Sequence, residues 1–243
     1  MFPLGTVLVP GMSLPLHVFE PRYRALAQRC VDEGLPFGVT LIARGFEVGG
    51  GEIRHDLGCL AEIEHAVRSE DGRWGLLCKG SQRFDVIRWL DDDPYPQAEI
   101  RLRPDPVPTV PAGAEGSPTE VLSERVDALK VLLRRTLAVG SEVGMQVQPA
   151  TVEIADDPIE ATWNICELAP IGDHDRFEVL GVDDPFDRVE TLTRLVAGAR
   201  ELIQYEMDSA EPDGDDALER AVAEWSSEQP DGATEQDDDA TDR

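Results

Sequence analysis

Residues 2–26, FPLGTVLVPGMSLPLHVFEPRYRAL, contain the pattern that decides the fold. Apolar side chains alternate over residues 2–8 and again over residues 14–18, which predicts two strands separated by a turn at Pro10-Gly11. The spacing then changes to that of a helix, with Pro21 at the first helical position and Gly34 as the expected end. The opening of the chain is therefore predicted to be two strands followed by one helix.

The strand pattern continues after this helix. Asp71-Gly72 is a typical hairpin turn signal, and the apolar runs around it are bounded by Gly, Pro or Asp. Further strands are predicted at residues 37–43, 59–67, 74–80, 84–90 and 98–102. A total of about seven short antiparallel strands with one inserted helix is typical of a compact barrel or half-barrel.

Helical periodicity replaces the strand pattern after a proline-rich segment at residues 104–118. Three helix starts, at Ser117, Asp157 and Asp184, are each followed directly by Pro, and Asp173 is expected to cap a short helix. Apolar stripes support the two longest helices: Leu122, Val126, Leu129, Leu133 and Leu137, and then Phe186, Val189, Leu192, Val196, Ala199 and Ile203. These helices are predicted to pack as a small bundle.

Together these patterns predict an α+β fold in four regions. Residues 1–106 would form the β subdomain, residues 107–118 a linker, residues 119–207 the helical bundle and residues 208–243 an acidic tail. The tail has 14 acidic residues, two arginines and no apolar period, so we expect it to be largely disordered.

The charge of the chain limits its partners. Asp and Glu number 49 against 22 Lys and Arg, which gives a net charge of −27, and both the tail and the rest of the chain are acidic. Phosphate groups are held by clustered Lys and Arg, so an acidic chain repels them. We therefore expect neither a nucleic-acid partner nor binding to a membrane.

Cysteine use and the lack of targeting signals predict a cytoplasmic protein. The first residues do not resemble a signal peptide, and no apolar run approaches the length needed to span a bilayer. The four cysteines are widely spaced, with no CxxC pair, and are expected to be free thiols in a reducing compartment.

No motif indicates a metal, a cofactor or a catalytic group. His55 and Cys59 are four residues apart, but no further ligand follows at a suitable spacing, so both are expected to be structural. A P-loop sequence is absent, and Lys79 and Lys130, the only lysines, lie outside any recognisable nucleophile setting. A hydrolase with an unrecognised Cys–His or carboxylate site stays open as an alternative.

Residues 10–23, PGMSLPLHVFEPRY, are unusually rich in apolar side chains. Leu14, Leu16 and Val18 suffice for the core, which leaves Pro15, His17 and Phe19 to face elsewhere. Two interpretations remain: a second buried surface, or an apolar strip that takes up an extended peptide.

Three stretches resemble one known family. Residues 2–26 look like the opening of the amino-terminal substrate-binding domain of Lon proteases. Residues 56–90, with a GxxRF stretch at Gly80–Phe84, are similar to the central strands of that domain, and residues 156–196 are similar to its helical part. The resemblance spans residues 1 to 205 and implies a PUA-like β pseudo-barrel followed by a helical bundle.

The resemblance also implies a role in protein binding. The ATPase and Ser–Lys peptidase modules of full Lon have no counterpart in these 243 residues, so the chain resembles free-standing, non-catalytic relatives of the domain. Expected partners are unfolded or degron-bearing polypeptides, together with a separate ATP-dependent protease and a second copy of the chain. A small-molecule sensor is a further alternative, because PUA-like barrels offer pockets.

Seven residues are candidates for peptide binding. Four would contact apolar side chains and three would orient the peptide: Met12, His17, Phe19 and Tyr23, and then Arg22, Arg44 and Arg83. A structural role is an alternative for Tyr23, on the apolar stripe of the helix, and for Arg83, which has acidic neighbours. The excess of acidic residues favours cationic or neutral peptides.

Overall fold

The computed structural model describes residues 1–45, 51–109, 113 and 115–209. The chain divides into two units, Met1–Ile203 and Gln204–Arg243. The first unit has the mixed α+β fold that the sequence predicts. In the second, the described residues are Gln204–Ser209, the end of the last helix. The predicted acidic tail, residues 208–243, lies outside the described residues apart from Asp208 and Ser209, which are helical.

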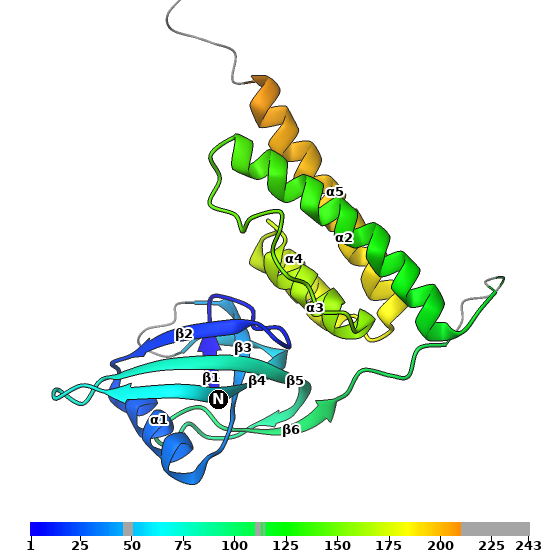
Figure 1. Cartoon of the computed structure of the whole chain (residues 1–243). Coiled ribbons are helices and arrows are strands. Elements are labelled where there is room, and N and C mark those ends of the chain that lie inside the picture. The colour runs from blue at the N-terminus through cyan, green and yellow to red at the C-terminus, as the bar shows by residue number, and fades with distance from the viewer. Residues whose placement is uncertain (46–50, 110–112, 114, 210–243) are drawn as a thin grey trace, which may run out of the picture. The chain divides into compact units, whose positions relative to one another are not determined.

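One curled sheet forms the first half of the chain (Figure 1). Its described strands pair in the order β1-β3-β4-β5-β2, and β6 pairs with β5 as well. The strands are β1 (Phe2–Leu4), β2 (Ser13–Val18), β3 (Phe37–Arg44), β4 (Ile53–Arg68), β5 (Trp74–Trp89) and β6 (Ala98–Arg103). β1 and β3 are parallel and the other pairs are antiparallel. β1, β2 and β6 each pair with one strand only, so the described sheet is open and forms a half-barrel.

Strand β5 differs most from the prediction. The two strands expected at residues 74–80 and 84–90 form one continuous strand of 16 residues. Its first part, Trp74–Lys79, pairs with β2, and its second part, Arg83–Trp89, pairs with β6. Residues 80–82 therefore mark a change of neighbouring strand, and the sheet has six described strands in place of about seven.

Helix α1 (Pro21–Glu33) packs on the half-barrel, as the sequence predicts. It begins with Pro21 and ends at Gly34, whose φ of 65° lies in the left-handed region that favours glycine. Its buried side chains join the first hydrophobic core, which also contains apolar residues of the strands and includes Leu4, Leu14, Val18, Tyr23, Leu26, Cys30, Val39, Cys59, Leu76 and Cys78.

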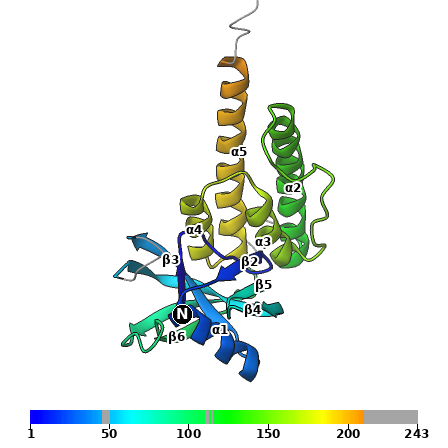
Figure 2. The same ribbon diagram turned by 90° about the vertical axis from the view of Figure 1, so that its left-hand side faces the viewer.

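The remaining helices enclose a second core. They are α2 (Pro118–Glu142), α3 (Pro158–Leu168), α4 (Asp173–Gly181) and α5 (Pro185–Ser209), and Figures 1 and 2 show them grouped together, apart from α1. Both predicted apolar stripes face this core, apart from Ile203, which is buried outside it; Ala199 is half-buried and the other named residues are buried. None of the described helices is both long and apolar enough to cross a membrane.

Three helix caps are as predicted and one is not. At the start of α5 the Asp184 carboxylate accepts a hydrogen bond from the Phe186 amide at 2.8 Å. Ser117 and Glu120 form the reciprocal capping box of α2, and the Asp157 carboxylate accepts hydrogen bonds from the first turn of α3. Asp173 was expected to cap α4, but Gly172 is the capping residue. The Asp173 carboxylate instead accepts hydrogen bonds from Thr6 Oγ1 (2.9 Å) and the Val7 amide (3.0 Å). These bonds tie the chain after β1 to α4, which is why β1 ends at Leu4 rather than at residue 8.

Candidate functional site

A small apolar cavity, the seam pocket, is lined by the two end strands of the half-barrel. Its volume is about 180 Å³. The lining residues come from β1, from β2, from the segment that leads into α1 and from α1 itself: Phe2, Leu4, Pro15, Leu16, His17, Val18, Phe19, Glu20 and Tyr23. Three of the seven predicted peptide-binding residues, His17, Phe19 and Tyr23, therefore line one cavity.

Strand alternation explains which side chains of β2 and its continuation remain accessible. Leu14 and Val18 are buried in the first core, whereas Pro15, His17 and Phe19 are exposed. Phe19 keeps 50% of its surface exposed. Of the two interpretations of this segment, the structure rules out a second buried surface.

Aromatic rings build the walls of the seam pocket. Phe2 stacks on Tyr23 with ring centroids 4.1 Å apart, and the centroids of the Phe2 and Phe37 rings are 6.0 Å apart. The rings of His17 and Phe19 are 6.3 Å apart. Tyr23 is only 2% exposed, so it supports the pocket from the core, while Phe19 stands at the open side.

The polar groups at this pocket are few. Burial raises the pKa of Tyr23 to about 12, so the phenol is neutral at physiological pH, and its hydroxyl has no hydrogen-bond partner among the described residues. The Arg22 guanidinium lies 4.4 Å from the centre of the Tyr23 ring and bonds to the Glu20 carboxylate at 3.2 Å. The pocket thus offers an apolar surface with one ion pair beside it.

The other predicted residues lie elsewhere. Met12 is half-buried and contacts both hydrophobic cores. Arg44 is exposed at the end of β3. Arg83 is only 2% exposed and points toward the helices. None of these three lines the seam pocket.

Arg83 borders a larger cavity, the junction cavity, between the sheet and α3. Its volume is about 470 Å³. Its walls come from a turn, from β5, from the end of β6 and the segment after it, and from α3: Pro10, Gly11, residues 79–83, Arg103, Pro104, Asp105, Ile159, Glu160, Trp163 and Asn164. In contrast to the seam pocket, this cavity is lined by several charged side chains of both signs.

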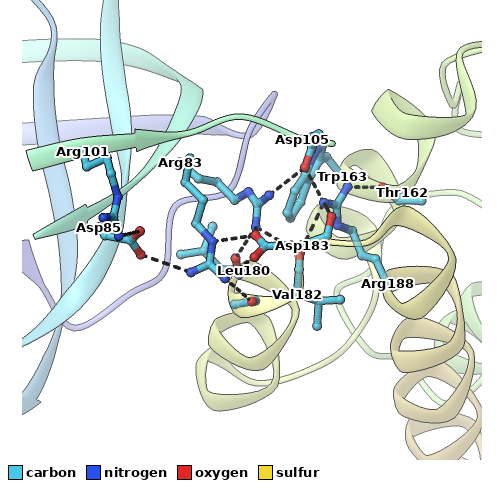
Figure 3. Close-up of polar contacts among 12 residues, drawn as sticks. Arg83, Asp85, Arg101, Asp105, Thr162, Trp163, Leu180, Val182, Asp183 and Arg188 are labelled. Atoms are coloured by element: carbon cyan, nitrogen blue, oxygen red, sulfur yellow. Dashed lines mark hydrogen bonds and ion pairs between the residues drawn. The ribbon is translucent and has the colours of Figure 1, made fainter. Parts of the chain in front are cut away.

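A buried ion network closes one side of the junction cavity (Figure 3). Asp105 accepts a hydrogen bond from Arg83 at 2.8 Å, another from Arg188 of α5, and a third from the Trp163 indole at 3.0 Å. The Arg188 guanidinium lies 3.8 Å from the centre of the Trp163 ring. Arg83 also donates to the Leu180 and Val182 carbonyls at the end of α4, each at 3.0 Å.

In this network the two buried guanidinium groups of Arg83 and Arg188 share the Asp105 carboxylate, and Arg83 also pairs with Asp183. Burial lowers the pKa of Arg188, and the adjacent Asp105 carboxylate opposes that shift. Arg103 supports the network from its edge by binding Asp183, and this bond lowers the pKa of Asp183. Because every arginine here bonds to protein groups, the network holds the sheet, the segment after β6 and the helices together.

Comparison with known proteins identifies the family. The family model described as "ATP-dependent protease La (LON) substrate-binding domain" matches residues 1–198. The chain belongs to the LON substrate-binding domain family.

Solved structures agree with this assignment. A Lon N-terminal domain protein from Xanthomonas campestris superposes with a TM-score of 0.55 at 29% identity, over 79% of this chain and 94% of that one. The N-terminal domain of a Mycobacterium avium complex Lon protease superposes with a TM-score of 0.53 at 16% identity, over 80% of this chain and 94% of that one. This match supports the fold alone.

The similar full-length proteins are longer than this LON domain chain. A LON peptidase N-terminal domain and RING finger protein of Schizosaccharomyces pombe is 25% identical over 85% of this chain and 46% of its own length. A Lon protease of Phenylobacterium zucineum is 24% identical over 86% of this chain and 25% of its own length. The chain thus spans less than half of either relative.

The GxxRF stretch of this LON domain has a structural role. Gly80 exchanges backbone hydrogen bonds with the turn before β2, at 2.8 Å to Gly11 and 2.9 Å to Met12. A Cβ atom on Gly80 would lie 2.1 Å from the Val9 carbonyl oxygen, so no other residue fits without a shift. Arg83 enters the ion network and Phe84 is fully buried.

Sequence reasoning missed residues of both cavities. Phe2 was assigned only to strand alternation, because no local pattern shows that its strand pairs with residues 37–44. Asp105 was given no role, because it lies in the proline-rich segment 104–118 at the end of the predicted β subdomain. Arg188 was overlooked as a polar residue of an amphipathic helix, and an Arg directly beside the apolar stripe was the available signal.

The cysteines of the LON domain are unsuited to nucleophilic chemistry. All four are buried, and burial raises the pKa of Cys59, Cys78 and Cys166 to about 12 and that of Cys30 to a lesser extent. The thiolate is the reactive form, and it is scarce at neutral pH under these conditions. His55 packs against the Phe177 ring, at 4.3 Å between centroids. Within the described ranges, no cluster of His, Cys, Asp and Glu could hold a metal ion.

Proposed function

We propose that this chain is a non-catalytic protein-binding domain that captures exposed apolar segments of unfolded or degron-bearing polypeptides. The observation that carries the proposal is the seam pocket, an apolar cavity with the half-exposed Phe19 at its open side. Contiguous apolar surface that remains accessible in a folded protein is typical of an interaction site.

The size of the seam pocket fits a side chain better than a free small molecule. Pockets for drug-sized ligands usually have volumes of about 300 to 1,000 Å³, and this one has about 180 Å³. One large aliphatic or aromatic side chain would enter it and contact Phe2, Leu16 and Phe19. Pro15 and His17, on the same side of β2 as Phe19, would contact the flanking residues of the peptide.

The main chain of the bound segment would add sequence-tolerant affinity. β1 and β2 are end strands, and in the described structure each pairs with one strand only. An extended peptide can hydrogen-bond to such a strand edge, while alternate side chains enter pockets. This arrangement suits a domain that must accept many sequences.

Charge and family membership suggest the class of polypeptide and its fate. The net charge of −27 favours segments with basic or neutral flanks over acidic ones. The relatives named as Lon proteases support a link to proteolysis, so we propose that the chain hands its cargo to a separate ATP-dependent protease in the cytoplasm. In this role it would act as a recognition domain or adaptor.

The proposal is tested by the change Phe19→Asp. The probe is a reduced, carboxymethylated protein that cannot refold, labelled for fluorescence anisotropy. A charge at the open side of the pocket should weaken its binding at least tenfold, or about 1.4 kcal/mol. The matched control is Val131→Asp on α2, since Val131 is 49% exposed and Phe19 is 50% exposed.

The unfolding transition of each variant in urea shows that the fold is intact. Val131→Asp should bind as the parent chain does. Equal affinities for the parent and Phe19→Asp would refute the site, and no salt-resistant binding by the parent would refute the function.

A further inference from the structure

Strand β6 presents an open edge. Among the described residues it pairs only with β5, and its four central residues, Glu99 to Leu102, are exposed on both faces of the strand. Proteins usually protect such edges with charged side chains, above all Lys, with Pro or with a bulge. The sequence of β6, AEIRLR, has no Lys or Pro, and the bulge in the β5–β6 ladder is on β5, between Val86 and Arg88. The charged side chains of β6 are neutralised within the chain, because Glu99 pairs with Arg88, Arg101 with Asp85 and Arg103 with Asp183. The edge therefore remains available to another strand.

An apolar cavity, the β6 cavity, adjoins this edge. It has a volume of about 240 Å³, and Ala98 and Ile100 of β6 line it together with Leu35 and Leu60. Leu102 follows on the same face of β6 by strand alternation, but it does not line the cavity and is 49% exposed. The strand thus carries an apolar hollow at one end of this face and a projecting leucine at the other.

The charges of β6 select one way of pairing with a second β6 strand. In an antiparallel pair that is symmetric about Ile100, Glu99 lies opposite Arg101 at two places, and Ala98 lies opposite Leu102. Sliding the second strand by two residues in either direction places Glu99 opposite Glu99 or Arg101 opposite Arg101. Like charges directly opposite each other are destabilising. The symmetric register about Ile100 therefore has no like-charge pair.

This register also matches the apolar surfaces. Side chains directly opposite each other have Cβ atoms about 4.5 to 5.5 Å apart, so Leu102 of each copy would reach the β6 cavity of the other beside Ala98. We propose that β6 is a homodimer interface in which two copies pair edge to edge about Ile100. A contact of this kind is isologous and closes after two copies. It uses a surface separate from the seam pocket and does not depend on peptide binding.

The test uses the full chain with two charge reversals, Glu99→Arg and Arg101→Glu. Sedimentation velocity from micromolar to millimolar concentration should show a monomer–dimer equilibrium for the parent. Each variant alone places like charges opposite each other and should raise the dimer dissociation constant at least tenfold. An equimolar mixture of the two variants restores both opposite-charge pairs, so dimers should return in the mixture.

Two further variants complete the test. Arg194→Glu reverses an exposed charge that pairs with Glu178 in the helical part, and it should leave dimerisation unchanged. Leu102→Glu leaves Glu99 and Arg101 unchanged but places a carboxylate at the β6 cavity, and it should also raise the dimer dissociation constant at least tenfold. The proposal is overturned if the parent stays monomeric, if both single reversals still dimerise as the parent does, or if the mixture does not recover.

Discussion

The junction cavity and the seam pocket are built on opposite principles. At the junction, Arg83 and Arg188 are buried, and each bonds to Asp105 and to backbone carbonyls. At the seam pocket the walls are aromatic and aliphatic, and Phe19 is half exposed. Side chains whose bonds are already made inside the protein hold elements together, whereas accessible apolar side chains have surface left for a partner. The contrast indicates a stabilising role for the first region and supports our proposal that the second region binds polypeptide.

The largest expected effect tests the structural side of this contrast. Asp105→Ala removes the carboxylate that Arg83 and Arg188 share and leaves two buried cations side by side. Removing one partner of a buried ion pair costs about 3 to 5 kcal/mol, so the free energy of unfolding in urea should fall by that amount. The control Asp71→Ala breaks an exposed pair with Arg73 and should cost less than about 1 kcal/mol. A variant that unfolds like the parent but binds peptide poorly would reverse the assignment of the two regions.

A smaller effect is expected at Gly80, which brings β5 and the turn before β2 together. Gly80→Ala places a methyl group against the Val9 carbonyl, and overpacking of this kind costs about 1 to 3 kcal/mol. In Gly75→Ala, on the same strand, the nearest atom is 4.0 Å from the new Cβ, so its unfolding free energy should match that of the parent within about 0.5 kcal/mol. Equal stability of the two variants would show that the GxxRF glycine is not required for packing.

The sequence predicts local structure better than it predicts the junction. Helix starts such as Ser117 and Asp157 are encoded within four residues, and the apolar stripes of α2 and α5 are periodic, so local patterns predict them. The bonds of Asp105 join it to residues 22, 58 and 83 positions away, and no local pattern encodes such contacts. Its proline neighbours even favour a linker.

Only those residues of the candidate site that a local pattern encodes could be predicted from the sequence. His17 and Phe19 follow from strand alternation alone, because β2 buries Leu14 and Val18 on its other face. Phe2 comes to the seam pocket from another strand, through a sheet order that local patterns do not specify. Arg83 was proposed to orient a bound peptide, with pairing to an acidic neighbour as the alternative, and in the structure it is buried and pairs with Asp105.

The smallest effect concerns pH and the edge of the ion network. The Arg103 guanidinium lowers the pKa of Asp183, so this pair stabilises the fold above the unfolded-state pKa of about 3.9 and the contribution is lost as the pH falls through the lower, folded-state pKa. The Asp183 side chain is 54% exposed, so solvent limits the effect to less than about 1 kcal/mol. The unfolding free energies of the parent and Asp183→Asn should therefore differ at pH 7, and this difference should shrink as the pH falls below about 4. A difference that widens in acid would contradict the pairing.

The most direct test of the central claim, that polypeptide binds at the seam pocket, is site-specific crosslinking. A photoreactive phenylalanine derivative replaces Phe19 in one preparation and Val131 in another, and each is irradiated with the carboxymethylated unfolded protein. We predict a crosslinked product from position 19 that a basic, apolar competitor peptide suppresses, and little product from position 131. Equal crosslinking from the two positions, or product from position 131 alone, would contradict the claim.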